Sequence, residues 1–134
     1  MTHTIVNPST LAQPSGYANG VLAEGGRLLF IAGQTGMDAT GKIVSPGEIV
    51  GQFQQALANI KEVVAAAGGE MTDIVKMTIF VTDKVAYRAS LKPIGAVYKS
   101  FFGKHYPAMA LIEVKSLWDD EAMIEIESAA MIGD

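Results

Sequence analysis

Two glutamates near the carboxyl end of the chain combine a residue type and a spacing that suit acid–base chemistry. Glu125 and Glu127 alternate with Ile124 and Ile126, and this alternation is typical of a β-strand that puts both carboxylates on one face. On a strand face buried by an oligomer, a carboxylate is suited to proton transfer. We interpret Glu127 as a solvated surface residue and retain Glu125 as a candidate catalytic residue. Lysines elsewhere in the chain could equally hold these acids in structural ion pairs.

The other motifs indicate turns and loops. The segment Gly36–Ile43 nearly matches the phosphate-binding pattern G-x-x-x-x-G-K-[ST], but Ile43 stands where the magnesium-binding hydroxyl belongs, so a turn is predicted. The chain has no cysteine, which excludes disulfides and thiolate ligands or nucleophiles. His3 and His105 lie far apart in the sequence, so we expect no metal site. We interpret His105 as a loop histidine, with a catalytic role left open.

Length and composition are those of a small globular protein. The 134 residues are 49% hydrophobic and 18% charged, which predicts a single domain over residues 1–134 with a packed core. The net charge of −4 disfavours nucleic acid as a partner, because binding to a phosphate backbone needs a basic surface. The first ten residues do not resemble a signal peptide, and no apolar run could span a bilayer, so we expect a cytoplasmic protein without a membrane partner.

Two helices are expected. The first starts at a capping box in which Ser45 caps, Pro46 takes the first helical position and Glu48 completes the motif. It ends at Gly68-Gly69, and its apolar face carries Ile49, Phe53, Ala56, Leu57, Ile60, Val64 and Ala67. The second starts near Ser90, because Pro93 is tolerated only in the first turn of a helix, and it ends before Gly103.

Alternating segments predict the strands. They cover residues 75–82, 107–115 and 123–129, together with a hairpin in which 19–24 pairs with 27–32 across Gly25-Gly26. This order predicts an α+β fold, with a mixed β-sheet and two helices packed on one face. The other face is expected to carry Phe80, Met109 and Leu111. An uncovered apolar face usually marks an interface, so we predict a homo-oligomer.

Several short motifs, in order over nearly the whole chain, resemble the YjgF/RidA (reactive intermediate deaminase) family. Each motif is weak alone, but the ordered set is specific. The motifs are Gly16-Tyr17, Ala32-Gly33-Gln34, the runs 56–60 and 74–83, Tyr98 with Phe101-Phe102, Pro107-Ala108 and the closing run 124–127.

The resemblance implies a chorismate-mutase-like subunit in a homotrimer, with a small-molecule cleft at each subunit interface. Deaminases of this family hydrolyse imines and enamines derived from amino acids without a cofactor. By resemblance, the cleft would form around Tyr17, the Gly33-Gln34 backbone, the strand that begins at Pro107, and Glu125 as the catalytic residue.

The sequence departs from the family pattern where the substrate carboxylate would bind. Met109 replaces the family's arginine, Ala110-Leu111 replace a Ser-Cys pair, and Gly95 stands in place of an asparagine on the second helix. A guanidinium grips a carboxylate by two charge-assisted hydrogen bonds, and methionine offers none. We therefore expect an apolar, adaptable substrate-binding cleft that is not tuned to small 2-imino acids.

Three functional hypotheses follow. The first is a cofactor-free hydrolase of another imine, enamine or related reactive metabolite, with Glu125 activating water. The second is a non-catalytic trimeric module that binds an apolar metabolite or a partner protein. The third is ribonuclease action or translation inhibition, as associated with some family members, which the acidic composition disfavours.

Overall fold

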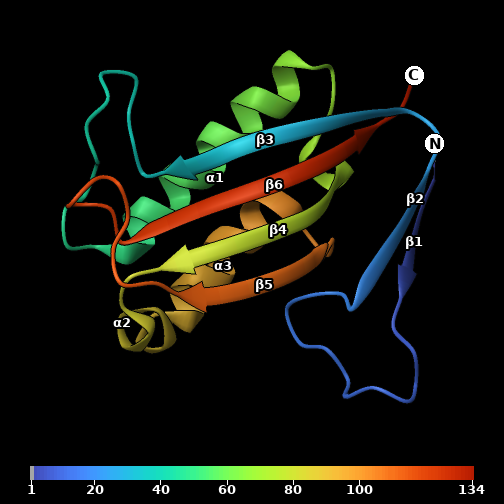
Figure 1. Ribbon diagram of the computed structural model, residues 1–134, viewed down its shortest axis with the longest axis horizontal. Coiled ribbons are helices and arrows are strands. Elements are labelled where there is room, and N and C mark those ends of the chain that lie inside the picture. The colour runs from blue at the N-terminus through green and yellow to red at the C-terminus, as the bar shows by residue number, and fades with distance from the viewer. Residues whose placement is uncertain (1) are drawn as a thin grey trace.

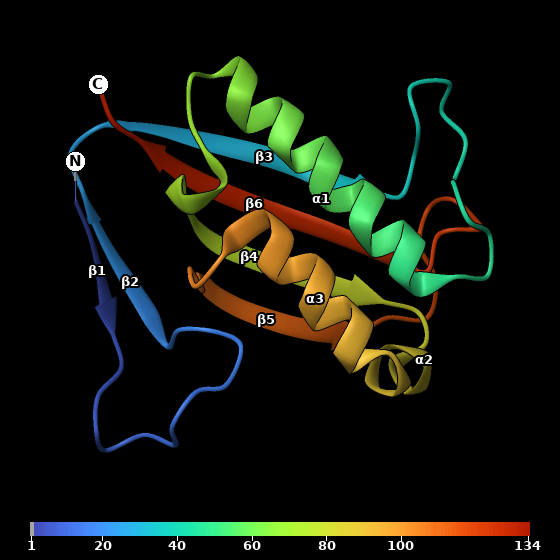
Figure 2. The same ribbon diagram turned by 180° about the vertical axis from the view of Figure 1, so that it is seen from behind.

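The computed structural model describes residues 2–134 as a sheet covered on one face by helices, with a separate pair of strands across one end (Figures 1 and 2). The predicted α+β class, with a mixed sheet and helices on one face, is confirmed. The elements are β1 (Thr2–Val6), β2 (Gly20–Glu24), β3 (Arg27–Thr35), α1 (Ile49–Ala66), a 3₁₀ turn (Met71–Asp73), β4 (Ile74–Val81), α2 (Lys84–Ala89), α3 (Leu91–Phe102), β5 (Ala108–Glu113) and β6 (Ile124–Ile132). The predicted domain over 1–134 also includes Met1, which lies outside the described residues.

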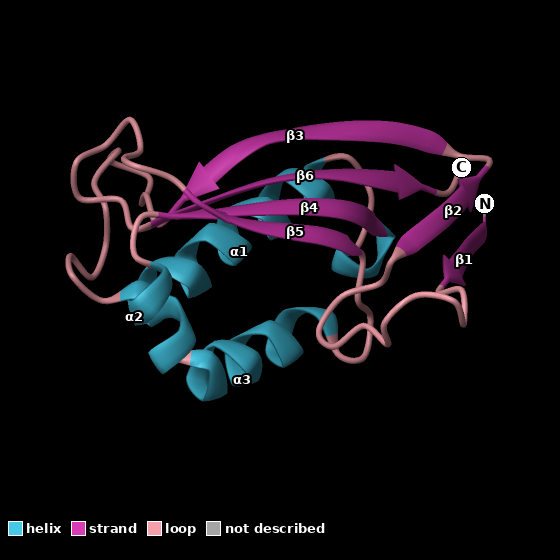
Figure 3. Ribbon diagram, turned by 60° about the horizontal axis from the view of Figure 1, so that its bottom comes forward, coloured by secondary structure: helices cyan, strands magenta, loops and turns pink. Residues whose placement is uncertain are grey.

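The main sheet has the strand order β3-β6-β4-β5. β6 pairs antiparallel with both β3 and β4, whereas β4 and β5 are parallel. A parallel pair needs a crossover connection, and α2 and α3 supply it. Figure 3 shows the helices on one side of this sheet. The core lies between the sheet and the helices, where Met77 and Val81 of β4 and Ile124 and Ile126 of β6 are buried with the apolar face of α1.

The first helix starts later than its sequence signal predicts. α1 begins at Ile49, and the N-cap residue Glu48, which precedes it, makes no side-chain capping hydrogen bond. Ser45 does not cap the helix: it has a φ of 49°, and with Gly47 at 79° it forms a turn ahead of α1. The capping-box prediction is therefore wrong, because a tight turn uses the residues that were assigned to the first helical turn. The predicted buried face is confirmed for Ile49 through Val64.

The second predicted helix is confirmed as α3. Ser90 precedes it, the Ile94 amide donates to the Ser90 carbonyl over 2.9 Å, and Pro93 falls in the first turn. The short helix α2 was not predicted. The Asp83 side chain caps it by accepting a hydrogen bond from the Ala86 amide over 3.0 Å.

The predicted hairpin between residues 19–24 and 27–32 is wrong. β2 pairs with β1 in a two-stranded sheet, while β3 pairs with β6. Gly25 and Gly26 adopt positive φ angles of 74° and 84°, conformations open to glycine because it lacks a Cβ. They turn the chain so that β2 runs crosswise past the end of the main sheet (Figure 1).

Two residues predicted on the open sheet face lie on the other one. The parallel register pairs Met109 with Met77 and Leu111 with Ile79, and Met77 and Ile79 are buried among the core residues under the helices. Paired residues share a sheet face, so Met109 and Leu111 also face the helices. Phe80, paired with Ile112, is on the open face as predicted. The misassignment arose because the sequence gives the alternation within β5 but not its register against β4.

No helix within residues 2–134 is both long enough and apolar enough to cross a membrane. The cytoplasmic location stays a prediction from the sequence.

Gln52 ties α1 to the segment before β6, and its loss should destabilise the fold. This fully buried side chain accepts from the Met123 amide over 2.8 Å and donates to the Glu121 carbonyl over 3.1 Å. Replacing Gln52 by leucine leaves both backbone groups without this partner, at a cost of about 1–3 kcal/mol in unfolding free energy. Urea denaturation of Q52L measures the loss. Q54L, on the exposed side of the same helix, should unfold like the parent, and an equal loss in both would contradict the assignment.

Candidate functional site

A cleft opens between α3 and β5 on the helix-covered side of the sheet. Its volume is about 450 Å³, within the usual range for small-molecule sites. Five residues that the sequence analysis assigned to the substrate cleft line it together: Tyr17, Gly95, Met109, Ala110 and Leu111. The structure thus brings together segments that lie more than 70 residues apart in the chain.

Backbone contacts with β5 hold the Tyr17 loop beside the cleft. The Ala18 amide donates to the Pro107 carbonyl over 3.0 Å, and Ala18 forms a parallel bridge with Ala108. Ala18 is 3% exposed, so this attachment is well packed. It places Tyr17 at the mouth of the cleft, next to the start of the strand that carries Met109.

Aromatic side chains form much of the cleft wall. The rings of Tyr98 and Tyr106 stack with centroids 5.2 Å apart, and the Tyr98 hydroxyl donates to the His105 carbonyl over 2.7 Å. Burial, with a smaller contribution from Tyr106, raises the pKa of Tyr98. Burial likewise raises the pKa of Tyr87. Both hydroxyls therefore stay neutral at physiological pH.

These tyrosines were not predicted from the sequence as cleft residues. Tyr98 was recognised only within a family-like motif, whereas Tyr87 lies on the unpredicted helix α2 and Tyr106 in the turn before β5. Aromatic residues gather around the second helix in the sequence, which was a usable signal, but only the crossover geometry puts them on one wall.

His105 has a structural hydrogen bond. Its Nε2 atom lies 2.7 Å from the Ile74 carbonyl, and a carbonyl can only accept, so Nε2 carries the proton in this contact. The ring therefore links the turn before β5 to the start of β4. This supports the interpretation of His105 as a loop histidine.

Gly33, Gln34 and Glu125 lie elsewhere, on β3 and β6. A Cβ atom at residue 33 would overlap the Glu125 carboxylate, so Gly33 leaves the space that this side chain occupies. The ladder between β3 and β6 is irregular between Ile31 and Gln34. Glu125 is paired with Phe80 of β4 and is therefore on the open sheet face.

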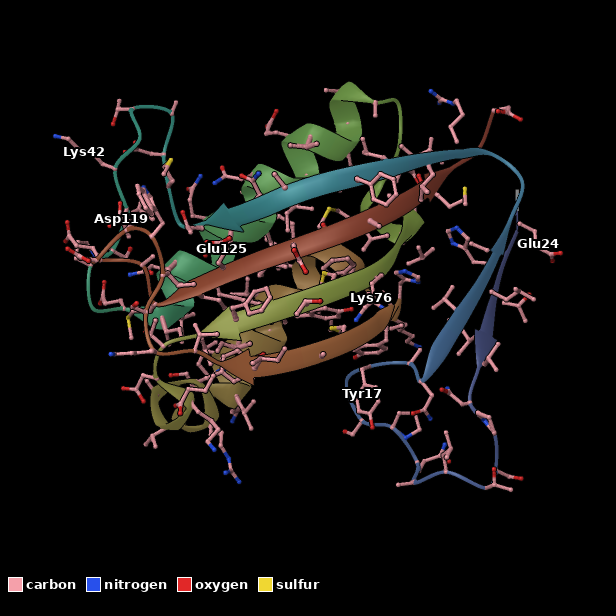
Figure 4. All side chains as sticks on the ribbon, viewed as in Figure 1. Tyr17, Glu24, Lys42, Lys76, Asp119 and Glu125 are labelled. Atoms are coloured by element: carbon pink, nitrogen blue, oxygen red, sulfur yellow. The ribbon has the colours of Figure 1, made fainter. Side chains whose placement is uncertain are left out.

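One chain does not unite the two groups. Figure 4 places Tyr17 beside the loop at one end of the sheet and Glu125 near the other end of β6. The cleft also opens on the helix side, whereas Glu125 is on the open face. The candidate site consists of two separate parts. One is the aromatic cleft, and the other, here called the carboxylate cluster, is the Glu125 carboxylate with Gly33 and Gln34 beside it.

The phosphate-loop look-alike forms a closed turn. The Asp38 side chain accepts hydrogen bonds from the Thr40 and Lys42 amides over 2.9 and 3.1 Å, and Met37 bridges to Ile43. These amides are already paired and α1 begins only at Ile49, so the segment lacks the free amides at a helix start that cradle a phosphate. Among residues 2–134, no group of three or more His, Cys, Asp or Glu side chains is arranged to hold a metal ion.

Comparison with known proteins gives consistent matches. The family model described as "Endoribonuclease L-PSP" matches residues 8–132. The 2-iminobutanoate/2-iminopropanoate deaminase of Capra hircus is 38% identical over 118 residues, which cover 87% of this chain and 80% of that protein. A RutC family protein of Pyrococcus horikoshii is 40% identical over 106 residues, 78% of this chain and 79% of that one.

Solved structures share the fold. A protein of unknown function of the conserved Rid protein family from Yersinia pestis, YyfB, superposes with a TM-score of 0.87 at 34% identity, covering 98% of this chain and all of the other. RidA from a Psychrobacter species gives a TM-score of 0.69 at 29% identity, covering 90% of this chain and 92% of the other.

The contact between Gly33 and Glu125 predicts that one methyl group added at residue 33 moves the Glu125 side chain. Gly33→Ala should displace the Glu125 carboxylate with little loss of fold stability, because the overlapping atoms belong to the end of a flexible side chain that can rotate away. Thermal unfolding and a crystal structure of the variant test both effects. Gly95→Ala is the control: nothing lies within 4 Å of its added Cβ, so this helix substitution should stabilise by up to about 1 kcal/mol. An unmoved Glu125 in the Gly33→Ala structure would contradict the contact.

Proposed function

Since this chain belongs to the YjgF/RidA (Rid) family, we propose that it is a cofactor-free hydrolase of an imine or enamine that is not a small 2-imino acid. The curated relatives named as 2-iminobutanoate/2-iminopropanoate deaminases support the reaction class. The proposed substrate class is based on the lining of the aromatic cleft. Its residues, all within the described part of the chain, include no lysine, arginine, aspartate or glutamate.

An uncharged cleft selects against a free carboxylate. Burying an ion without a partner is costly, and Met109 supplies no hydrogen bond at the position where the YjgF/RidA family has an arginine. Tyrosine faces and the flexible Met109 side chain favour a substrate with an apolar or aromatic body. The substrate class is therefore a neutral imine or enamine with such a body.

Glu125 is the proposed general base. Water adds to the imine carbon while Glu125 accepts a proton from the water and the nitrogen takes up a proton from solvent. The protonated Glu125 then donates to the nitrogen of the resulting carbinolamine. The carbon–nitrogen bond breaks, the hydroxyl proton is released to solvent, and a carbonyl compound and ammonia leave. The balance is one imine and one water in, and one carbonyl compound and one ammonia out, without an oxidant or cofactor.

A second copy must complete this site, because in one chain Tyr17 and Glu125 lie far apart (Figure 4). We propose a homotrimer in which the aromatic cleft of one subunit meets the carboxylate cluster of the next. The exposed apolar side chains of the open sheet face and its edges support an interface there, among them Phe30, which is 78% exposed. Light scattering after size-exclusion chromatography measures the mass.

A non-catalytic binding module is the second candidate, and Met109 is the observation that favours it. A cleft without the arginine could hold a neutral metabolite and return it unchanged. Ligand recovery distinguishes the two functions: a hydrolase returns a carbonyl compound and ammonia, and a binding module returns the ligand intact.

Glu125→Gln should abolish hydrolysis and leave binding intact. The carboxamide keeps the size of the side chain but cannot act as a base. The assay compares two imines made in situ by oxidases, a neutral arylalkyl imine and 2-iminopropanoate, and follows ammonia release. We expect acceleration of the neutral imine that disappears in E125Q. Glu127→Gln, the exposed neighbour on the same strand face, should retain the activity. Faster hydrolysis of 2-iminopropanoate than of the neutral imine would contradict the proposed substrate class.

Met109→Arg should move the preference toward carboxylate substrates. A hydrogen bond to a charged group contributes about 1.5–3 kcal/mol, so kcat/KM for 2-iminopropanoate should rise by more than about tenfold. The neutral imine should become a poorer substrate. Met109→Gln, similar in length but uncharged, is the matched control and should not produce the gain. An equal gain in both variants would show that charge at residue 109 does not set the preference.

A further inference from the structure

Gly95 lies in the middle of α3, where glycine is unfavourable because it gives up more conformational freedom on folding than any other residue. Two ordinary reasons for a glycine do not apply to it. Its φ is not positive, and, apart from its own helix backbone and chain neighbours, no atom of residues 2–134 lies within 4 Å of a Cβ atom built at this position. Neither backbone conformation nor close packing therefore requires a glycine here.

The empty space beside Gly95 belongs to the aromatic cleft. Gly95 lines the cleft together with Leu91, Ile94 and Tyr98. The spacing of these residues, i, i+3, i+4 and i+7, puts them on one face of α3. Three of them project side chains from this face and Gly95 projects none. The cleft therefore owes part of its space to the missing side chain at residue 95.

The two ends of the cleft differ in polarity. α3 leads into β5 through a short turn, so the helix and the strand run in opposite directions (Figure 2). Tyr98 therefore lies near the start of β5, where it stacks on Tyr106, and Leu91 lies toward the part of β5 that carries Leu111. The hydroxyl groups of Tyr17 and Tyr106 make the first end the more polar one. Leu91 and Tyr98 are about 10 Å apart along the helix, at a rise of 1.5 Å per residue.

The end near Leu91 offers apolar surface that a ligand could cover. Leu91 and Leu111 are 55% and 39% exposed, whereas Ile79 and Ile94 in the same lining are buried in the core. Covering exposed leucine side chains with an apolar group removes them from water and is favourable. A flat ring can lie against the bare backbone at Gly95, in space that any side chain at this position would occupy.

We propose that Gly95 is the specificity-determining residue of the aromatic cleft, and that one aromatic ring of the ligand lies in the space left at this residue. The polar end of the ligand points toward Tyr17. This narrows the ligand to a neutral imine or carbonyl compound with a single aromatic ring on a short alkyl spacer, which matches the length of the cleft. The position of the imine rests on the proposed function, whereas the ring site follows from the shape of the cleft.

Ketone binding tests the ring site without any turnover. Benzylacetone and butanone are neutral methyl ketones that differ by one phenyl ring. Each is titrated into the full-length protein with isotope-labelled leucine methyl groups, and NMR spectra are recorded. Benzylacetone should bind roughly ten- to hundredfold more tightly, as expected for burying a phenyl-sized group, and should shift the methyl signals of Leu91 and Leu111. Equal affinity for both ketones, or unmoved signals of these two leucines, would overturn the proposal.

Substitutions at residue 95 test the role of the missing side chain. Gly95→Leu fills the ring site, so the ratio of the two dissociation constants should fall nearly to one. Gly95→Ala adds a single methyl group and should lower the ratio part of the way, which gives a second measurement if the leucine variant does not fold. Ala96→Leu, at an exposed neighbouring residue outside the cleft lining, is the matched control and should keep the parent ratio. An unchanged ratio in both Gly95 variants, or an equal fall in Ala96→Leu, contradicts the assignment.

The ketone titration and the imine assay fail independently. A preference for benzylacetone in a protein that hydrolyses no imine would support the ring site and refute the hydrolase. Imine hydrolysis that depends on Glu125, in a protein without a preference for benzylacetone, would support the hydrolase and refute the ring site.

Discussion

The position of β6 between β3 and β4 is the constraint on which the rest of the structure depends. Its pairing with both neighbours fixes one register across three strands. Since side chains alternate along a strand, that register sends Ile124 and Ile126 into the core under α1 and turns Glu125 to the opposite face. A shift of one residue would bury a carboxylate and expose the isoleucines. The register of β6 therefore determines both the stability of the core and the placement of Glu125.

The sequence predicted most of what local pattern determines. The apolar face of α1, the start of α3 at Ser90 and the alternation in β4 and β6 each depend on residues close together in the chain. Predictions failed where the outcome depends on distant pairing. A capping box at Ser45 was an adequate local signal, but Ser45 lies in a turn and the helix begins only at Ile49. The Ser45 carbonyl in this turn accepts a hydrogen bond from the Gln52 side chain over 3.3 Å.

The candidate site shows the same division. Family-like motifs selected Tyr17, Gly95 and Met109, and the fold places these residues around one cleft. The tyrosines of the cleft wall escaped notice because the crossover from β4 to β5 decides which sides of α2 and α3 face β5. The sequence also placed Met109 on the open face, because alternation fixes relative sides within a strand but not which side meets the helices. Pairing with Met77 supplies the missing information.

The separation of Glu125 from the aromatic cleft has a physical consequence for the chemistry. An imine carbon bound beside Met109 meets neutral hydroxyls and apolar groups in its own subunit, which can bind it but cannot remove a proton from water. The carboxylate that could do so is on the far face of the sheet. The proposed hydrolysis at this cleft therefore requires a second subunit, whose contact would both supply the base and exclude bulk water.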